Sequence, residues 1–156
     1  MSEWKNKPDK IEEYEGFVYL ITNLRNKRFY IGQKRFWTTR RLPALKGRTK
    51  KEQEKRAKLK GNKRHIKKES NWKDYWGSSR ELKQEIKIQG KDSFERKILK
   101  LCKNKLEMNY FEFKEQITND ILFNRKSYNN MINVRFNGNN LKKLIDKEEH
   151  DTNYKN

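Results

Sequence analysis

Two tyrosines, Tyr19 and Tyr30, lie eleven residues apart, each within a run of β-branched and aromatic residues. Two such runs around the polar stretch 24–27 predict a β-hairpin over residues 15–33, which brings both phenols near one face. A phenol with an ordinary pKa near 10 is a poor base at neutral pH, so proton transfer here needs cationic neighbours. We expect Gly32 to end the second strand, where the backbone can turn or approach a ligand. The alternative is an ordinary amphipathic hairpin with two half-buried tyrosines.

Several kinds of site are disfavoured by the residue counts. Cys102 is the single cysteine, and His65 and His150 are the two histidines. These counts disfavour a disulfide framework, a thiolate or histidine zinc site, and a Ser-His-Asp triad. A lone cysteine fits a reducing cytoplasm.

The chain of 156 residues carries a net charge of +19, and 32% of its residues are hydrophobic. A small core and a strong positive charge predict one domain that binds an anionic partner, with nucleic acid first among the candidates. The segment 34–73 holds seventeen Lys and Arg against three Glu, which is +14 of the total. We expect this segment to be a solvated loop that binds phosphates. The sequence shows no signal peptide and no apolar run near 18 residues, so we expect no membrane contact.

The remaining elements follow from local patterns. Ser78 and Glu81 fit a capping box that opens a helix over residues 79–89, which Gly90 ends. Residues 94–101 alternate like a strand, and residues 105–118 predict a second helix. The apolar stripe of this second helix is Leu106, Tyr110, Phe113 and Ile117. These elements predict an α+β fold, a small three-stranded antiparallel sheet flanked by helices, with a long basic insertion after the hairpin.

The order of these features resembles the GIY-YIG nuclease family, and in particular its Seg-like homing endonucleases of bacteriophages. The halves of the family motif match Phe17-Val18-Tyr19 and Tyr30-Ile31-Gly32. In the first half the glycine lies one residue early, at Gly16, while the tyrosine is kept. The resemblance covers about residues 16–133. Together with the polar composition of both ends, it predicts a flexible arm at 1–13, a nuclease domain at 14–135 and a polar tail at 136–156. If a phage encodes the protein, the cytoplasm in which it works would be that of the host.

The resemblance also implies the roles of individual residues. Tyr19 would be the general base toward water, and Tyr30 would orient that water or the phosphate. The family's arginine follows the motif glycine by about eight residues, on the helix after the hairpin, which places it at Arg40. The family's Tyr-Asn pair matches Tyr128-Asn129, where Asn129 would fix the fold near the site together with Gly32.

The metal-binding glutamate of the family lies on a later helix. Glu112, in the context Phe111-Glu112-Phe113, matches it best, and Glu107 is the reserve. Both lie on the flanks of the predicted apolar stripe, whereas a plain surface carboxylate paired with a lysine is the alternative for either. One carboxylate favours a single Mg²⁺ or Mn²⁺ ion over a two-metal site.

The activity that the resemblance implies is metal-dependent hydrolysis of double-stranded DNA to 5′-phosphate and 3′-hydroxyl ends. The phosphate contacts would come from basic residues in and beside the segment 34–73: Lys34, Arg35, Arg41, Lys46, Arg48, Lys67, Lys68 and Lys73. No obligatory protein partner is expected, and double-strand cutting would need a dimer on DNA or sequential visits. The alternatives are a non-catalytic basic nucleic-acid-binding protein and a catalytically decayed member of the family.

Overall fold

A computed structural model describes residues 3–41 and 65–133 of the chain. Its main sheet has the strand order β1-β6-β2-β3, with β2 at Gly16–Asn23 and β3 at Phe29–Arg35. These two strands are antiparallel and form the predicted hairpin, and Tyr19 lies opposite Gly32. The predicted third strand is also present as β6, Phe94–Cys102, and is antiparallel to β2.

The prediction of a three-stranded antiparallel sheet is wrong in one respect, because a fourth strand makes the sheet mixed. Strand β1, Trp4–Lys5, pairs in parallel with β6. Trp4 is buried, its ring lies edge-on to Phe17 at 5.1 Å between centroids, and its Nε1 donates to the carbonyl of Trp72 at 2.9 Å. The prediction that residues 1–13 form a flexible arm is therefore wrong at β1, because the buried indole of Trp4 holds this strand against the core.

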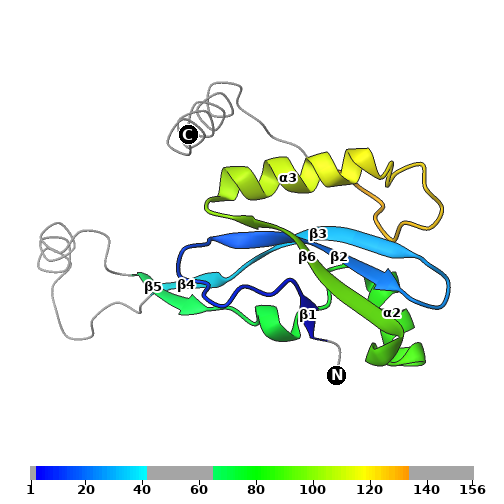
Figure 1. Ribbon diagram of the computed structural model, residues 1–156, viewed down its shortest axis with the longest axis horizontal. Coiled ribbons are helices and arrows are strands. Elements are labelled where there is room, and N and C mark those ends of the chain that lie inside the picture. The colour runs from blue at the N-terminus through cyan, green and yellow to red at the C-terminus, as the bar shows by residue number, and fades with distance from the viewer. Residues whose placement is uncertain (1–2, 42–64, 134–156) are drawn as a thin grey trace, which may run out of the picture.

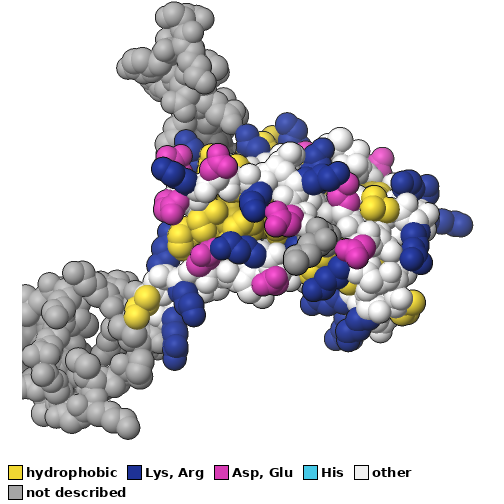
Figure 2. All heavy atoms as spheres, turned by 60° about the horizontal axis from the view of Figure 1, so that its bottom comes forward, with side chains coloured by type: hydrophobic (Ala, Val, Ile, Leu, Met, Phe, Trp, Pro, Cys, Tyr) yellow, Lys and Arg dark blue, Asp and Glu magenta, His cyan; other side chains and the backbone are white. Residues whose placement is uncertain are grey.

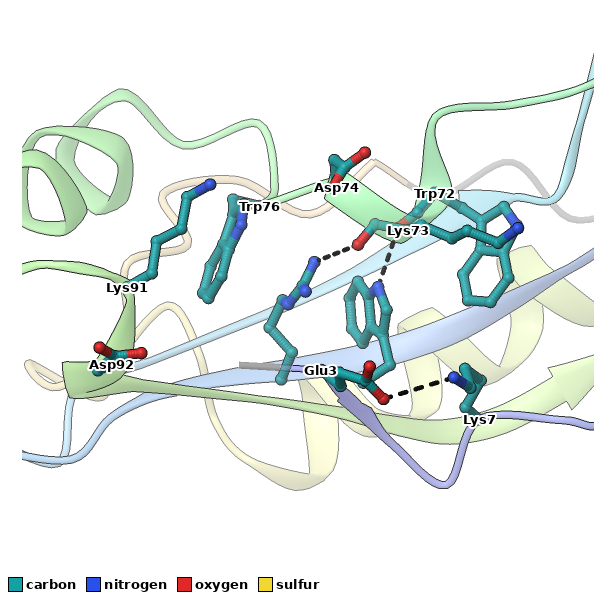
Figure 3. Close-up of a pocket in the computed structure, with 10 residues that line it drawn as sticks. Glu3, Lys7, Trp72, Lys73, Asp74, Trp76, Lys91 and Asp92 are labelled. Atoms are coloured by element: carbon teal, nitrogen blue, oxygen red, sulfur yellow. Dashed lines mark hydrogen bonds and ion pairs between the residues drawn. The ribbon is translucent and has the colours of Figure 1, made fainter. Parts of the chain in front are cut away.

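Trp4 lines a pocket of about 560 Å³ between β1, η1 (Trp72–Asp74) and η2 (Lys91–Ser93). Figure 3 shows the side chains that line this pocket. The Arg96 guanidinium lies between two indoles, 4.7 Å from the ring centroid of Trp4 and 4.2 Å from that of Trp76. It also donates to the carbonyls of Lys73 and Tyr75, both at 2.9 Å. The indoles and the guanidinium here bind one another, which fastens β1 to the sheet.

Two helices cover opposite faces of the sheet (Figure 1). Helix α2, Arg80–Gln89, packs Leu82 and Ile86 into a cluster with Phe17 and Tyr19. Helix α3, Lys105–Thr118, covers the other face, where Met108 packs in a cluster with other buried side chains, namely Val18, Ile31, Cys102 and Ile121. Both helices were predicted within one residue, because caps and turns mark their ends.

The predicted capping box at Ser78 is wrong by one residue. Ser79 is the N-cap of α2, and its Oγ accepts from the amide of Leu82 at 3.3 Å. Ser78 is thereby left outside the helix, where its hydroxyl bonds the phenol of Tyr30 at 2.8 Å. The true cap thus frees Ser78 for a contact with the hairpin.

The predicted apolar stripe of α3 does not face the sheet. Its members Tyr110 and Ile117 are exposed, while Met108 and Gln116 are buried. The sheet-facing side needs a polar group as well as an apolar one, since Gln116 Nε2 donates to the carbonyl of Ile31 at 3.3 Å. Met108 packs against Gly16, where a Cβ would lie 2.6 Å from the Met108 side chain.

We predicted that the basic segment 34–73 is a solvated loop. Its described part instead contains two paired strands. Strands β4, Trp37–Arg41, and β5, His65–Glu69, pair as an antiparallel ribbon with Arg41 opposite His65. The Trp37 indole fastens the ribbon to the domain by donating to the carbonyl of Tyr14 at 2.9 Å.

Within 3–41 and 65–133, no helix has the length and apolarity that a membrane span requires.

Candidate active site

A cleft of about 1090 Å³ runs along β3, the edge strand of the main sheet. Its walls come from the start of α2, from the sheet-facing side of α3 and from the segment after Tyr128. The polar side chains in it include Tyr30, Gln33, Arg80, Glu112, Gln116 and Asn129. Residues from four separate parts of the sequence therefore meet at one edge of the sheet.

Tyr30 is the phenol that reaches this cleft. It is half-buried, and burial raises the pKa of its hydroxyl even though the bond with Ser78 opposes that rise. A phenol with a raised pKa stays protonated at neutral pH, so it donates one hydrogen bond and accepts others. The bond with Ser78 ties this hydroxyl to the residues that immediately precede α2.

Tyr19 lies beside Tyr30, at 6.1 Å between ring centroids, but it does not line the cleft. It is 1% exposed, and burial raises its pKa well above the ordinary value, with further contributions from Tyr30 and Tyr75. The two phenols are thus neighbours on one face, as the hairpin predicted, while the structure places only one of them at the cleft. A buried phenol of raised pKa is poorly suited to accept a proton from water.

Gly32 has a different role from the one that we predicted. It lies inside β3, which continues to Arg35, so it does not end the strand. A Cβ at this position would lie 2.6 Å from the Tyr19 hydroxyl oxygen and 2.9 Å from the ring of Tyr30. The glycine therefore gives both tyrosine rings the space to lie across the strand.

Glu112 faces β3 from α3, and the amide groups of two glutamines bind its carboxylate. Gln33 Nε2 donates to Oε2 at 2.5 Å, and Gln116 Nε2 donates to Oε1 at 3.3 Å. Burial raises the pKa of this carboxyl, while the bond from Gln33 and the charge of Lys105 act in the opposite direction. The Glu112 side chain therefore borders both the core and the cleft. It does so from the sheet-facing side of α3, one turn from each of Met108 and Gln116, and not from the flank that we predicted.

The reserve residue Glu107 lies at the N-terminal end of α3 instead. Its Oε2 accepts from the backbone amide of Lys103 at 2.7 Å, and its own amide donates to the N-cap Asn104 at 2.9 Å. Glu107 is not among the residues that line the cleft. Its contacts are those of a capping carboxylate.

Asn129 bonds both backbone groups of one residue in the edge strand. Its Oδ1 accepts from the amide of Ile31 at 2.9 Å, and its Nδ2 donates to the carbonyl of Ile31 at 2.8 Å. The preceding residue, Tyr128, continues the contact by donating its amide to the carbonyl of Phe29 at 2.8 Å. The Tyr128-Asn129 pair therefore closes the free edge of β3 next to Tyr30.

The structure does not bring Arg40 to the cleft, and the prediction that it lies on a helix is wrong. Arg40 lies on β4, where it is exposed and opposite Ile66 of β5. The ribbon and η1 separate the hairpin from the first helix, so counting residues from Gly32 reaches a strand. Arg80, the first residue of α2, lines the cleft instead. The signal that we missed was an arginine directly after the N-cap sequence Gly77-Ser78-Ser79.

The predicted phosphate-binding residues are spread over the described surface. Lys67 lies over the Trp37 ring at 4.6 Å, Lys68 is exposed on β5, and the backbone of Arg41 belongs to β4. Three others already bind protein groups. Lys34 Nζ donates to Asn71 at 2.8 Å, Arg35 pairs with Glu15 at 2.8 Å, and Lys73 pairs with Glu69 at 3.1 Å. Lys46 and Arg48 lie outside the described residues.

Figure 2 shows one face of the molecule, on which Lys and Arg side chains alternate with Asp and Glu instead of forming one patch. This mixing agrees with the ion pairs of Arg35 and Lys73. On this face, the charge is therefore less one-sided than the net charge of +19 suggests.

The oxygen donors of the cleft suit a hard cation. Among the described residues there is no group of three His, Cys, Asp or Glu that could hold a metal ion. Mg²⁺, however, is commonly held by one or two carboxylates together with water and substrate phosphate. The half-buried carboxylate of Glu112, with the amide oxygen of Asn109 among the neighbouring cleft residues, fits such a site.

Comparison with protein families agrees with this arrangement. Residues 1–137 match the family model described as the GIY-YIG domain of the putative endonuclease segE. The chain belongs to this family. No curated protein and no solved structure gave a match. Membership of this GIY-YIG family supports a nuclease with a nucleic-acid substrate, and the cleft along β3 is where the motif tyrosine Tyr30 meets Arg80 and Glu112.

Proposed function

We propose that the protein is a metal-dependent endonuclease that hydrolyses double-stranded DNA to 5′-phosphate and 3′-hydroxyl ends. The observation that supports this most is the convergence of Tyr30, Arg80 and Glu112 from three elements on one cleft. In the reaction the oxygen of a water molecule forms a bond to phosphorus, and the bond from phosphorus to the 3′ oxygen breaks. The water loses a proton to the solvent as its bond to phosphorus forms, and the 3′ oxygen takes up a proton from the solvent, which leaves a 5′-phosphate and a 3′-hydroxyl.

Arg80 takes the role that the resemblance gave to Arg40. As the first residue of α2 it is exposed and lines the cleft beside Ser78 and Glu81. Its guanidinium fork can bind two non-bridging oxygens of one phosphate, and its charge then stabilises the negative charge of the transition state. The helix N-terminus beneath it adds a favourable field for the same anion.

The two motif tyrosines take different roles in this proposal. The phenol of Tyr30, with Ser78 as its partner, binds and orients the attacking water or the phosphate. Tyr19 does not exchange protons with water, because it is buried and its pKa is raised. It is a positioning residue whose ring supports Tyr30 and which depends on the space at Gly32. This replaces the general-base role that the resemblance implied.

Glu112 would hold the metal ion, with Mg²⁺ or Mn²⁺ the expected choice. A cation bound to its carboxylate offsets the cost of ionising a half-buried acid. When bound, the ion supplies Lewis-acid stabilisation of charge on the phosphate and on the leaving oxygen. Gln33 and Gln116 keep the carboxylate turned toward the cleft.

A homing-type role in a phage or another mobile element would require a preferred target sequence in addition. The family model supports the endonuclease activity, while the homing-type role rests on the resemblance to Seg-like homing endonucleases. Mapping cut ends over a whole phage or bacterial genome tests it. One recurring sequence at the ends is the expected result, and ends spread without preference would contradict it.

The catalytic proposal is tested on supercoiled plasmid with Mg²⁺. We expect the protein to cut, and we expect both Glu112→Gln and Arg80→Ala to bind the plasmid without cutting it. Arg40→Ala is the matched control, since it removes an exposed arginine that lies away from the cleft. If the unaltered protein binds the plasmid but does not cut it with any of the metal ions tested, the catalytic proposal is contradicted. The protein would then be a nucleic-acid-binding protein without nuclease activity.

A further inference from the structure

The turn that follows α3 has an exposed apolar tip. Leu122 is 54% exposed and Phe123 is 91% exposed, whereas the preceding Ile121 is 2% exposed and belongs to the core under α3. A phenylalanine this exposed buries almost none of its ring in the fold. Exposed apolar groups of this kind often mark an interaction surface.

This tip is held in place by hydrogen bonds within the turn. The amides of Phe123 and Asn124 both donate to the carbonyl of Asp120 at 2.9 Å, and the amide of Ser127 donates to Asn124 at 3.0 Å. Asp120 adopts a positive φ of 48°, which reverses the chain after the helix. With Ile121 anchored in the core, the backbone of the turn holds the two apolar side chains outward.

Exposed basic residues lie on the same turn as the tip and on a second turn that is joined to it. Arg125 and Lys126 follow it on the same turn and are exposed, and Asp120 is the acidic residue of this turn. The β2–β3 turn lies at the same end of the molecule (Figure 1) and adds exposed Arg25 and Lys27. The two turns are joined where the amide of Phe29 donates to the carbonyl of Lys126 at 2.9 Å. This combination suits a polyanion with apolar faces between its charges.

The tip is also continuous with the cleft. Five residues lead from Phe123 to Tyr128, which lines the cleft together with Asn129 and Met131. Five residues span at most about 18 Å. That length corresponds to about five base-pair steps of 3.4 Å along a duplex.

We propose that the Leu122–Phe123 tip inserts between base pairs of duplex DNA close to the phosphate in the cleft. Arg125 and Lys126 bind the phosphates on either side of that step. Apolar side chains that enter a duplex in this way unstack the step and kink the DNA. The inference rests on the proposed function in one respect, that duplex DNA is what the cleft binds.

The test uses the Glu112→Gln protein, so that binding is measured without cutting. A short duplex carries one 2-aminopurine, a base that fluoresces more brightly when unstacked, and a series of duplexes moves it along the sequence. We expect a fluorescence increase on binding within about five base pairs of the position at which the active protein cuts. Adding Phe123→Ala should abolish the increase and weaken binding roughly tenfold, because the variant has no aromatic ring to stack on a base.

Ile88→Ala is the matched control, because Ile88 is an apolar residue of α2 that is 83% exposed. It should leave both the fluorescence and the affinity unchanged. Unaltered fluorescence and affinity in Phe123→Ala would overturn the inference. A second result would also overturn the inference. If sedimentation shows that the wild-type protein is a dimer, and Phe123→Ala dissociates the dimer without changing DNA binding, the tip contacts protein and not DNA. Failure of the unaltered protein to bind DNA would overturn both proposals, whereas binding without cutting removes only the catalytic one.

Discussion

The carboxyl of Glu112 is a proposed metal ligand, and its ionised form destabilises the fold. Burial raises its pKa, so between its unfolded and folded pKa values the folded protein binds more protons than the unfolded chain. The free energy of unfolding therefore falls as pH rises from the unfolded pKa, near 4.3, to the folded pKa, and this group adds no further change above that. At neutral pH the ionised form thus costs stability.

Glu112→Gln should consequently raise the melting temperature at pH 7 while it lowers DNA cleavage by on the order of 100-fold or more. Calorimetry at pH 7 and again near pH 4 checks the stability part. At the lower pH the wild-type side chain is also neutral, so the gain should shrink toward zero. A variant that is less stable than the wild type at pH 7 would show that the carboxylate stabilises the fold.

Tyr19 and Tyr30 should respond differently to removal of the hydroxyl. Tyr30→Phe removes the group that meets Ser78 in the cleft, so we expect cleavage to fall by about 10- to 100-fold. Tyr19→Phe removes a buried hydroxyl that does not line the cleft, so we expect a smaller decrease. Single-turnover rates at saturating protein measure both. An equal or greater decrease in Tyr19→Phe would restore the general-base role to that residue.

Individual side chains were the hardest feature to predict from the sequence. Glu112, which lines the cleft, could be proposed because its helix and its neighbours are contiguous in the chain. Arg80, which also lines the cleft, was not proposed because its distance from Gly32 includes the ribbon and η1, whose length no local pattern reports. The position of an arginine relative to a helix cap was the more reliable signal, because a cap fixes which residue begins the helix.

Among the elements, the edge strand β3 depends on Asn129 for two of its backbone hydrogen bonds. Asn129→Ala leaves the buried amide of Ile31 without its partner, while the carbonyl of Ile31 keeps the bond from Gln116. We expect the free energy of unfolding to fall by about 1–3 kcal/mol, which is the cost of one unsatisfied buried group. Urea denaturation measures this decrease.

Asn130→Ala is the control for this change, because Asn130 is the exposed neighbour on the same segment. It should alter the free energy of unfolding by less than about 0.5 kcal/mol. An equal effect of both substitutions would mean that the bonds to Ile31 contribute little, and that the segment is held by other contacts.

Element boundaries followed from the sequence where the signal is local. The hairpin, both helices and β6 have their own periodicity, caps or turns, and the structure agrees within a residue or two. Strand β1 and the sheet-facing side of α3 were missed, since both depend on contacts between distant residues. Trp4 is buried against Trp72, and Gln116 faces the sheet because of the carbonyl of Ile31.

At the scale of the whole molecule, much of the basic charge belongs to residues 42–64, which hold ten Lys and Arg against two Glu. Arg41 and His65 are opposite each other at the end of the ribbon, so an Asn-Gly turn can replace 42–64 and close β4 onto β5. We expect this variant to keep its melting temperature and to bind DNA with a shallower dependence on salt. The slope of log affinity against log salt should change by about 0.9 for each phosphate that the variant no longer neutralises.

An unchanged slope would mean that the segment 42–64 binds no phosphate. The control is Lys27→Ala, a single exposed charge on the β2–β3 turn, which should change the slope by about 0.9 at most if it binds one phosphate. Both variants are compared with the unaltered protein in the same buffers, because affinities at a single salt concentration do not separate charge from other effects.

The parallel pairing of β1 with β6 also bears on the order in which the protein is made. Trp4 leaves the ribosome long before its partner Arg96, which lies opposite it in the sheet. Contacts between residues so far apart in sequence close slowly, and they form only after the intervening chain has been synthesised. Strand β1 is therefore made well before its partner β6, and it can take its place in the sheet only once β6 has been synthesised.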